Sequence, residues 1–194
     1  SFEIEFPLQK VFEFSTLENM ARCLAELRMN ESSVVLPAVE VAPSRENLPL
    51  TFAQERLWFL EKFSPGLVAY HIPGFFRLKG SIDLDAINRA YNALLLRHES
   101  LRTVFSTVDE KAVQSIMPPE PVSIEVVDLS AYLGEVLVAK TEQTAFDEVS
   151  IPFDLELGLP VRLKLIKQSP DHYVLVLTLH HIISDGWSMG VFLS

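Results

Sequence analysis

Two neighbouring histidines close an apolar run near the carboxyl end of this sequence. They are His180 and His181 in the stretch LHHIISDGWS, Leu179–Ser188, and they are followed by Asp185 and Gly186. Imidazole titrates near neutral pH, so a histidine held in one tautomer can accept or donate a proton during a reaction. A carboxylate can pair with a cation, and a glycine permits a tight turn. The stretch therefore predicts proton-transfer chemistry at the end of a buried strand.

Metal binding and simple packing are the alternatives for this pair. Neighbouring residues on a strand point to opposite faces, so His180 and His181 cannot readily hold one ion while the strand continues. A zinc site would need further ligands. The remaining histidines and the single cysteine are scattered along the sequence: His71, His98, His172 and Cys23. We therefore expect no metal site. A packed pair of core histidines remains as the other alternative, although each buried imidazole would then need a hydrogen-bond partner.

The elements that would position the histidines follow from hydrophobic periodicity. Residues 172–179 are apolar on both faces, which predicts a central strand covered by helices. Residues 161–165 alternate as a half-buried strand does. Strands interleaved with helices predict an α/β sandwich. We expect further strands at 69–79 and 122–127, a hairpin of strands at 101–108 and 112–117, and helices at 131–148 and from 81 or 83 to 98. Thr51 and Gln54 are typical of a capping box at the start of a further helix over 51–63.

The sequence divides into two units. Pro37 and Pro43 stand among polar residues, which predicts an extended linker over 29–47. Residues 1–28 have helical periodicity but few apolar companions, whereas residues 48–194 contain the strands and the histidine pair. The first residue is a serine, and a new helix has only begun when the sequence stops. We expect a fragment of a longer polypeptide.

Composition excludes several functional classes. The 194 residues are 48% hydrophobic, with 16 Lys and Arg and a net charge of −10, so no nucleic-acid partner is expected. Apolar runs such as Tyr173–Leu177 are too short to span a bilayer, so no membrane is expected either. The single cysteine, Cys23, cannot form an internal disulfide, which predicts a reducing cytoplasmic location and a packed apolar role for this residue.

Three ordered blocks carry a family resemblance. HHIISDG, residues 180–186, matches the HHxxxDG signature of nonribosomal peptide synthetase condensation domains. TFAQERLWFL, residues 51–60, resembles the opening (S/T)xAQxRLWxL block of that family, and RHESLRTVF, residues 97–105, resembles its RHExLRTxF block. The resemblance covers residues 48–194. It implies a chloramphenicol acetyltransferase-like α/β sandwich, of which this chain would hold the N-terminal lobe.

The resemblance also implies an activity and a set of partners. Condensation domains join the acyl or peptidyl thioester of an upstream carrier to the amine of a downstream carrier-bound aminoacyl group. Residues 1–28 resemble the end of a peptidyl carrier domain. No GGxS motif occurs in the sequence, so the phosphopantetheine serine is expected upstream of residue 1 and no cofactor is expected on this chain. The expected partners are both carriers, an adenylation domain and the missing C-terminal lobe, without which the chain should be inactive.

The resemblance assigns site residues by position. His181, the second histidine, matches the catalytic residue, which would remove a proton from the attacking amine or hold the amine in line. His180 is expected to support it, and Gly186 to let the backbone approach the thioester.

A buried ion pair is expected at Asp185. A buried carboxylate needs a cation, and the family suggests an arginine from the second block. Arg97 is the first choice and Arg102 the second. The alternative for Arg97 is a surface position at a helix C-terminus, where a cation is favoured in any case.

Two relatives of this scaffold are alternatives for the function. Epimerisation domains keep the HHxxxDG histidines and would remove an α-proton, and other relatives only recruit partners. Cyclisation domains replace the histidines by aspartates, so His180 and His181 argue against a cyclisation domain. Glu99 and Thr103 favour the condensation subtype that joins two L-residues. A non-catalytic recruiter would be expected to lose His181.

Overall fold

The computed structural model describes residues 8–14, 16–29 and 40–193. The chain forms two compact units, Ser1–Ala42 and Pro43–Ser194. Parts of two predicted segments therefore lie outside the described residues, namely the start of the expected carrier remnant and most of the expected linker.

The described residues of the first unit form the helices α1 (Leu8–Glu13) and α2 (Leu17–Met29). Thr16 begins α2, because its hydroxyl oxygen accepts a hydrogen bond from the Asn19 amide at 3.3 Å. Cys23 is buried, so the prediction that it packs as an apolar residue is confirmed.

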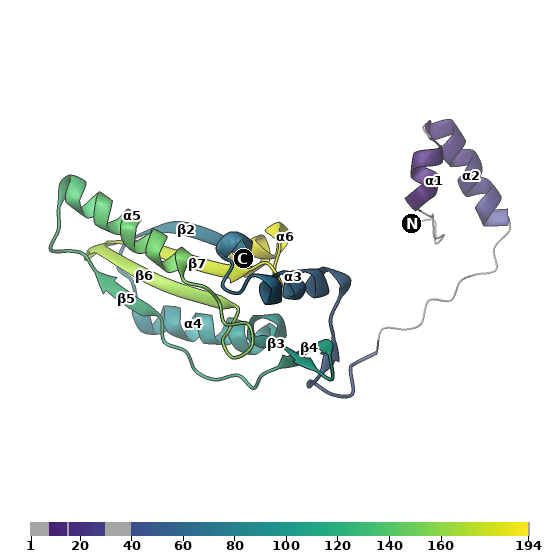
Figure 1. The fold of residues 1–194 in the computed structure, drawn as a ribbon. Coiled ribbons are helices and arrows are strands. Elements are labelled where there is room, and N and C mark those ends of the chain that lie inside the picture. Colours follow the sequence, from purple (N-terminus) through teal and green to yellow (C-terminus); the bar gives the residue numbers. More distant parts are fainter. Residues whose placement is uncertain (1–7, 15, 30–39, 194) are drawn as a thin grey trace. The chain divides into compact units, whose positions relative to one another are not determined.

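The second unit is built on a four-stranded sheet with the order β2-β7-β6-β5 (Figure 1). The strands are β2 (His71–Lys79), β5 (Glu125–Asp128), β6 (Val161–Ser169) and β7 (His172–His180). β7 pairs antiparallel with both β2 and β6, while β5 pairs parallel with β6. The predicted central position of β7 is thus confirmed, and its end lies against the start of β2.

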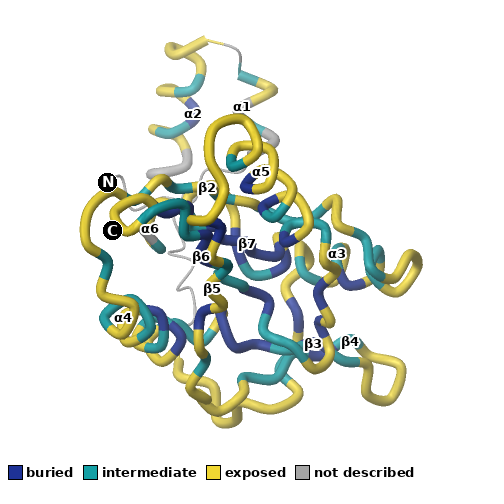
Figure 2. The backbone as a smooth tube through the Cα atoms, turned by 90° about the vertical axis from the view of Figure 1, so that its left-hand side faces the viewer, coloured by how far each residue is buried: buried dark blue, intermediate teal, exposed yellow. Residues whose placement is uncertain are grey.

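Helices cover both faces of this sheet, as the two-sided apolar pattern of β7 predicted (Figure 2). One face packs against α4 (Leu84–Arg97), with Tyr91, Leu165 and Leu177 in its core. The other face packs against α5 (Gly134–Ser150). The core of that second face contains Ala145, Ile166, Val174 and Val176. The fold is therefore the expected α/β sandwich.

A second, smaller sheet lies beside the first, with the order β1-β4-β3. Its strands are β1 (Leu48–Pro49), β3 (Thr103–Val108) and β4 (Lys111–Ile116). The turn residues Asp109 and Glu110 both have positive φ angles, which is typical of a tight two-residue hairpin. The predicted hairpin is confirmed, although it pairs with β1 and forms a separate sheet.

Helix α3 (Phe52–Phe63) joins the small sheet to the histidine segment. The predicted capping box at its start is present: Gln54 N donates to Thr51 Oγ1, and Thr51 N donates to Gln54 Oε1. Trp58 of α3 is buried in a cluster that includes Ile182, the second residue after β7. The small sheet and α3 therefore help to hold the loop that follows the histidines.

The predicted linker ends earlier than expected. Ile116 N donates to the Arg45 carbonyl at 2.8 Å, and Asn47 N donates to Ser115 Oγ at 3.1 Å. Arg45 also forms an ion pair with Glu99. Residues 43–47 therefore belong to the second unit, because β4 supplies partners for their backbone.

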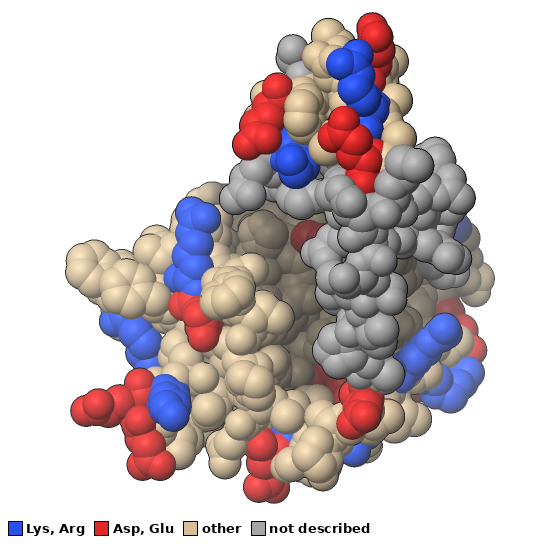
Figure 3. All heavy atoms as spheres, turned by 90° about the vertical axis from the view of Figure 1, so that its right-hand side faces the viewer, with Lys and Arg blue, Asp and Glu red and all other residues tan. Residues whose placement is uncertain are grey.

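The remaining short elements are η1 (Val68–Tyr70), η2 (Glu99–Arg102) and α6 (Gly186–Leu193). Within the described residues, no helix is both long and apolar enough to span a bilayer. Acidic and basic side chains are intermixed on the face shown in Figure 3.

Candidate active site

The loop after β7 separates the two histidines as predicted. His180 is the last residue of the strand and is 2% exposed, whereas His181 is exposed. The His181 amide donates to the Tyr70 carbonyl at 2.8 Å, and the Ile183 amide donates to the His180 carbonyl at 3.2 Å. The chain therefore turns directly after His180, so the two imidazoles occupy different environments.

The imidazole of His181 is held in one tautomer. Its Nδ1 lies 2.7 Å from the Ser184 carbonyl oxygen. A carbonyl oxygen can only accept, so Nδ1 carries the hydrogen, and Nε2 of the neutral ring keeps its lone pair. Ser184 is itself buried, and its hydroxyl donates to the His180 carbonyl at 3.0 Å. The result is an exposed, oriented proton acceptor at Nε2.

His180 has the opposite arrangement. Its Nδ1 accepts a hydrogen bond from the Ile182 amide at 3.1 Å, so Nδ1 holds the lone pair. Burial lowers the pKa of His180 to about 4, and the neighbouring imidazoles of His71 and His181 add to the effect. Below about pH 6.5, His180 binds a proton in the unfolded chain, whereas in the folded chain it binds one only below about pH 4. His180 therefore lowers the free energy of unfolding as the pH falls through this window.

The expected buried ion pair at Asp185 is wrong. Asp185 is exposed, and its Oδ1 accepts from the Ser188 amide at 2.8 Å and the Ser188 hydroxyl at 2.7 Å. These hydrogen bonds lower the pKa of the Asp185 carboxyl. Asp185 thus stands at the start of α6 as an N-cap, a position that carboxylates favour. It does not need a buried cation, because it is not itself buried.

The two candidate arginines have other surroundings. Arg97 is exposed at the last turn of α4. Arg102 is buried, where its Nε donates to the Leu95 carbonyl at 3.1 Å, one of its terminal nitrogens donates to the Met117 carbonyl, and the other lies 3.5 Å from Glu99. Arg102 therefore satisfies the C-terminal end of α4.

The cap and the ion pair predict different results for substitutions at Asp185. If Asp185 caps α6, Asp185→Asn should unfold at nearly the wild-type temperature, because asparagine caps a helix as well as aspartate does. Asp185→Ala should lower the unfolding temperature at pH 7. The depressed pKa means that this loss should disappear as the pH falls through the folded pKa, below 3.8. Thermal unfolding of both variants between pH 7 and pH 3 is the measurement. A large loss in Asp185→Asn would instead require a cation partner.

The approach of the Gly186 backbone to the thioester stays a prediction. Gly186 begins α6, and a Cβ added there would meet no described atom within 4 Å. Trp187 follows it and is 79% exposed.

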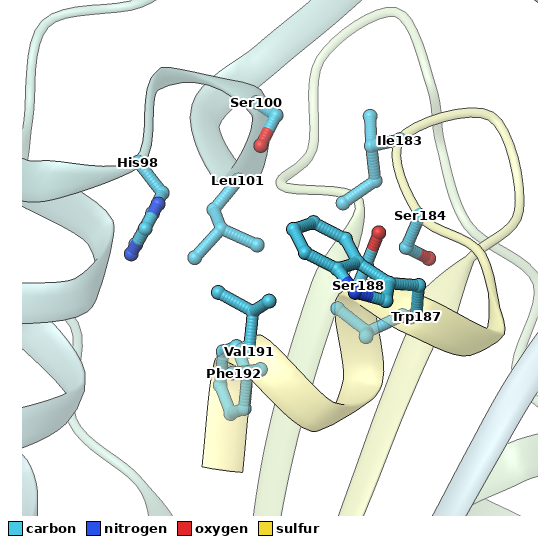
Figure 4. A pocket seen from close by; sticks show the side chains of 10 residues that line it. His98, Ser100, Leu101, Ile183, Ser184, Trp187, Ser188, Val191 and Phe192 are labelled. Atoms are coloured by element: carbon cyan, nitrogen blue, oxygen red, sulfur yellow. The ribbon is translucent and has the colours of Figure 1, made fainter. Parts of the chain in front are cut away.

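A pocket of about 180 Å³ lies beside the histidine loop, between α6 and the segment that joins α4 to β3 (Figure 4). Ile183 and Ser184 belong both to this pocket and to the loop that orients His181. The remaining lining residues are His98, Ser100, Leu101, Leu179, Trp187, Ser188, Val191 and Phe192. The pocket wall is therefore mainly apolar, and its polar part consists of three serines and the His98 imidazole.

Two backbone carbonyls of the site could not be predicted from the sequence. Tyr70 and Ser184 bind His181 through their main-chain oxygens, which any residue type supplies. Within the described ranges, no three histidine, cysteine or carboxylate side chains gather as a group that could hold a metal ion.

The family described as Condensation domain matches residues 44–194. The chain belongs to this family. The match begins within one residue of the compact second unit, which starts at Pro43. It includes all three sequence blocks, so the condensation-domain resemblance of residues 48–194 is confirmed.

Curated relatives of this condensation-domain chain are large synthases and synthetases. A linear gramicidin synthase polypeptide of Brevibacillus parabrevis is 39% identical over 193 residues, which is 100% of this chain and 2% of that polypeptide. Malpinin synthetase of Mortierella alpina is 39% identical over 187 residues, which is 96% of this chain and 2% of that synthetase. The first match therefore extends through the first unit as well as the condensation domain. The chain spans only a small part of the length of the relatives that it matches.

Solved structures agree on the fold. The X-domain in its complex with OxyB from teicoplanin biosynthesis is 32% identical with a TM-score of 0.70, over 81% of this chain and 33% of that chain. The first condensation domain of the calcium-dependent antibiotic synthetase is 24% identical with a TM-score of 0.68, over 75% of this chain and 35% of that chain. The second likeness supports the chloramphenicol acetyltransferase-like fold alone.

Proposed function

We propose that this chain supplies the N-terminal lobe of an amide-forming condensation domain in a nonribosomal peptide synthetase. The observation that carries the proposal is the exposed His181, whose Nδ1 binds the Ser184 carbonyl and whose Nε2 is left as a proton acceptor. The donor would be an acyl or peptidyl thioester on an upstream carrier. The acceptor would be the amine of an aminoacyl group on a downstream carrier.

The amine needs little help from a base before it attacks the thioester. A free α-amino group has a pKa near 8, so part of it is already neutral at pH 7. Attack on the thioester carbonyl forms the C–N bond, and the C–S bond breaks to release the thiolate of the upstream phosphopantetheine. The attacking nitrogen becomes acidic as it gains positive charge. His181 Nε2 accepts its proton, which then passes to the thiolate.

The loop geometry supports this role for His181. A base that must be in place before the reaction benefits from a fixed ring orientation, because orientation is then not lost in the transition state. The hydrogen bond to Ser184 supplies that orientation, and the Tyr70 carbonyl fixes the backbone of the same residue. His180, buried behind it, supports the loop.

The partners follow from the proposed reaction. Residues 1–28 would be the C-terminal helices of the upstream carrier, which would present its donor on phosphopantetheine. The downstream carrier, an adenylation domain and the C-terminal lobe of the condensation domain would complete the assembly. We place the synthetase in the cytoplasm. No cofactor is expected on this chain itself.

Partner recruitment without catalysis is a second candidate function. It is favoured by the likeness to the X-domain, which was solved as a complex with OxyB. Amide formation is favoured by the intact HHIISDG loop and by the His181 tautomer that leaves Nε2 as a proton acceptor.

The test uses the synthetase that contains this chain. Both carriers are loaded, the donor with an α-deuterated aminoacyl group, and the carrier-bound products are measured by mass spectrometry. We expect a dipeptidyl group on the downstream carrier, with the deuterium retained. Loss of deuterium without amide formation would support an epimerisation domain. Neither product from two loaded carriers would support a recruiter.

A further inference from the structure

A third histidine lies against the buried member of the pair. His71 begins β2 and is the register partner of His180 at the end of β7. Their ring centroids are 6.0 Å apart, and the Phe153 ring lies 4.9 Å from His71 and 5.9 Å from His180. The three rings meet edge to face. His71 and Phe153 therefore form part of the cover that removes His180 from water.

Backbone groups determine the tautomers of both imidazoles. His71 Nδ1 lies 2.7 Å from the Val149 carbonyl oxygen, which can only accept, so this nitrogen carries a hydrogen. His180 Nδ1 accepts from the Ile182 amide and must lack one. A proton added to His180 would occupy Nδ1 and abolish the bond to Ile182. The loop bond therefore exists only while His180 is neutral.

Most of the charged groups around the rings also oppose protonation. The Arg162 guanidinium of β6 lies 3.9 Å from the centre of the Phe153 ring. Burial lowers the pKa of His71, the bond to Val149 opposes this shift, Arg162 adds to it, and Glu61 of α3 acts against it. His180 is in turn faced by His71 from β2 and by His181 from its own loop. Most of these contributions favour neutral rings.

We propose that His71 is a positioning residue: its ring keeps His180 covered and neutral, and neutral His180 holds the Ile182 amide and hence the loop that orients His181. This inference rests on the proposed amide-forming function. His71 does not itself touch the reacting atoms. The link runs from β2, through the buried ring at the end of β7, to the exposed proton acceptor.

Two substitutions separate the ring of His71 from its hydrogen bond. His71→Asn keeps an N–H near the position of Nδ1, which can still donate to Val149, but removes the ring. His71→Phe keeps a ring as cover but removes the donor. The imidazole pKa of His180 is measured by NMR titration of the 194-residue chain. We expect it to rise toward its ordinary value near 6.5 in His71→Asn and to stay low in His71→Phe.

The same variants are compared in amide transfer by the loaded synthetase at pH 6 and pH 8. If His180 titrates near 6.5, about a quarter of it is neutral at pH 6 and nearly all at pH 8. The ratio of the rate at pH 8 to that at pH 6 should therefore increase about fourfold in His71→Asn relative to wild type, and remain unchanged in His71→Phe. A purely structural role would lower both rates together.

A measurement on the unsubstituted chain protects the test against misfolded variants. At pH 7, ¹⁵N spectra should show the hydrogen of His180 on Nε2 and that of His71 on Nδ1. The opposite tautomer at His180, or an unchanged pKa of His180 in folded His71→Asn, would overturn the proposal. Failure of the proposed function is a different result, because wild-type synthetase would then form no amide at any pH.

Discussion

His181→Ala, introduced into the synthetase that contains this chain, is expected to slow amide transfer by about 10²–10⁴-fold and to leave carrier loading unchanged. That range is what a positioned proton acceptor typically contributes. His181 is exposed, so removal of its side chain leaves no cavity in the core. The loss should therefore appear in the transfer rate and not in the stability of the domain.

His181→Asn distinguishes proton acceptance from loop order. Asparagine can place an N–H where His181 Nδ1 now donates to the Ser184 carbonyl, but it has no basic nitrogen at the position of Nε2. If proton acceptance is the role, His181→Asn should be about as slow as His181→Ala. If the hydrogen bond to Ser184 is what matters, the asparagine variant should recover most of the rate.

His172→Ala is the matched control for these variants. His172 stands at the opposite end of β7 with about half of its side chain exposed, so the same substitution is made on the same strand, far from the loop. Its transfer rate should equal that of wild type. The readout is the rate of dipeptidyl-carrier formation by mass spectrometry with both carriers preloaded. Wild-type transfer by a correctly folded His181→Ala protein would remove His181 from the mechanism.

Local patterns predicted the elements that position His181. The capping box of Thr51 and Gln54 lies within four residues, and the two-sided apolar pattern of β7 lies within one strand. Such patterns can be recognised without knowing which distant residues lie nearby, because the geometry of one helix or strand sets the spacing of its own side chains. The separation of His180 from His181 followed from the same alternation together with the end of the strand.

Contacts between distant segments could not be predicted in this way. His71 meets His180 only because β2 pairs with β7 in one particular register, across more than a hundred residues of sequence. The proposed pairing of Asp185 failed for a related reason. The Asp185 carboxylate accepts a hydrogen bond from Ser188, three residues away, and Arg102 donates to a carbonyl at the end of α4. A charge in a sequence block does not reveal whether it becomes buried.

The most strongly buried carboxylate of the second unit is Glu148, and its charge network also had no signal in the sequence. Glu148 is 4% exposed near the C-terminal end of α5. Its carboxylate lies 2.9 Å from Arg162 Nε and 2.8 Å from Lys164 Nζ. Arg162 also donates to the carbonyls of Glu148 and Ile151, which satisfies the end of the helix. Burial alone would lower the pKa of Lys164, but its hydrogen bonds to Glu148 and Glu125 raise it.

Glu148→Gln is expected to reduce the free energy of unfolding by about 3–5 kcal/mol. The substitution keeps the shape of the side chain but removes the negative charge between two cations, and removal of one partner from a buried pair leaves the others uncompensated. Arg162 and Lys164 would then face each other across a neutral amide in a poorly solvated site. Urea unfolding of the 194-residue chain measures the loss.

Glu125→Gln is the matched control, because the same change is made at the other carboxylate of Lys164. The Glu125 side chain is 66% exposed, and water screens its ion pair, so little stability should be lost. Equal losses in the two variants would mean that burial of Glu148 does not strengthen its charge interactions. A large loss at Glu148 alone would show that burial strengthens the charge interactions of this carboxylate with Arg162 and Lys164.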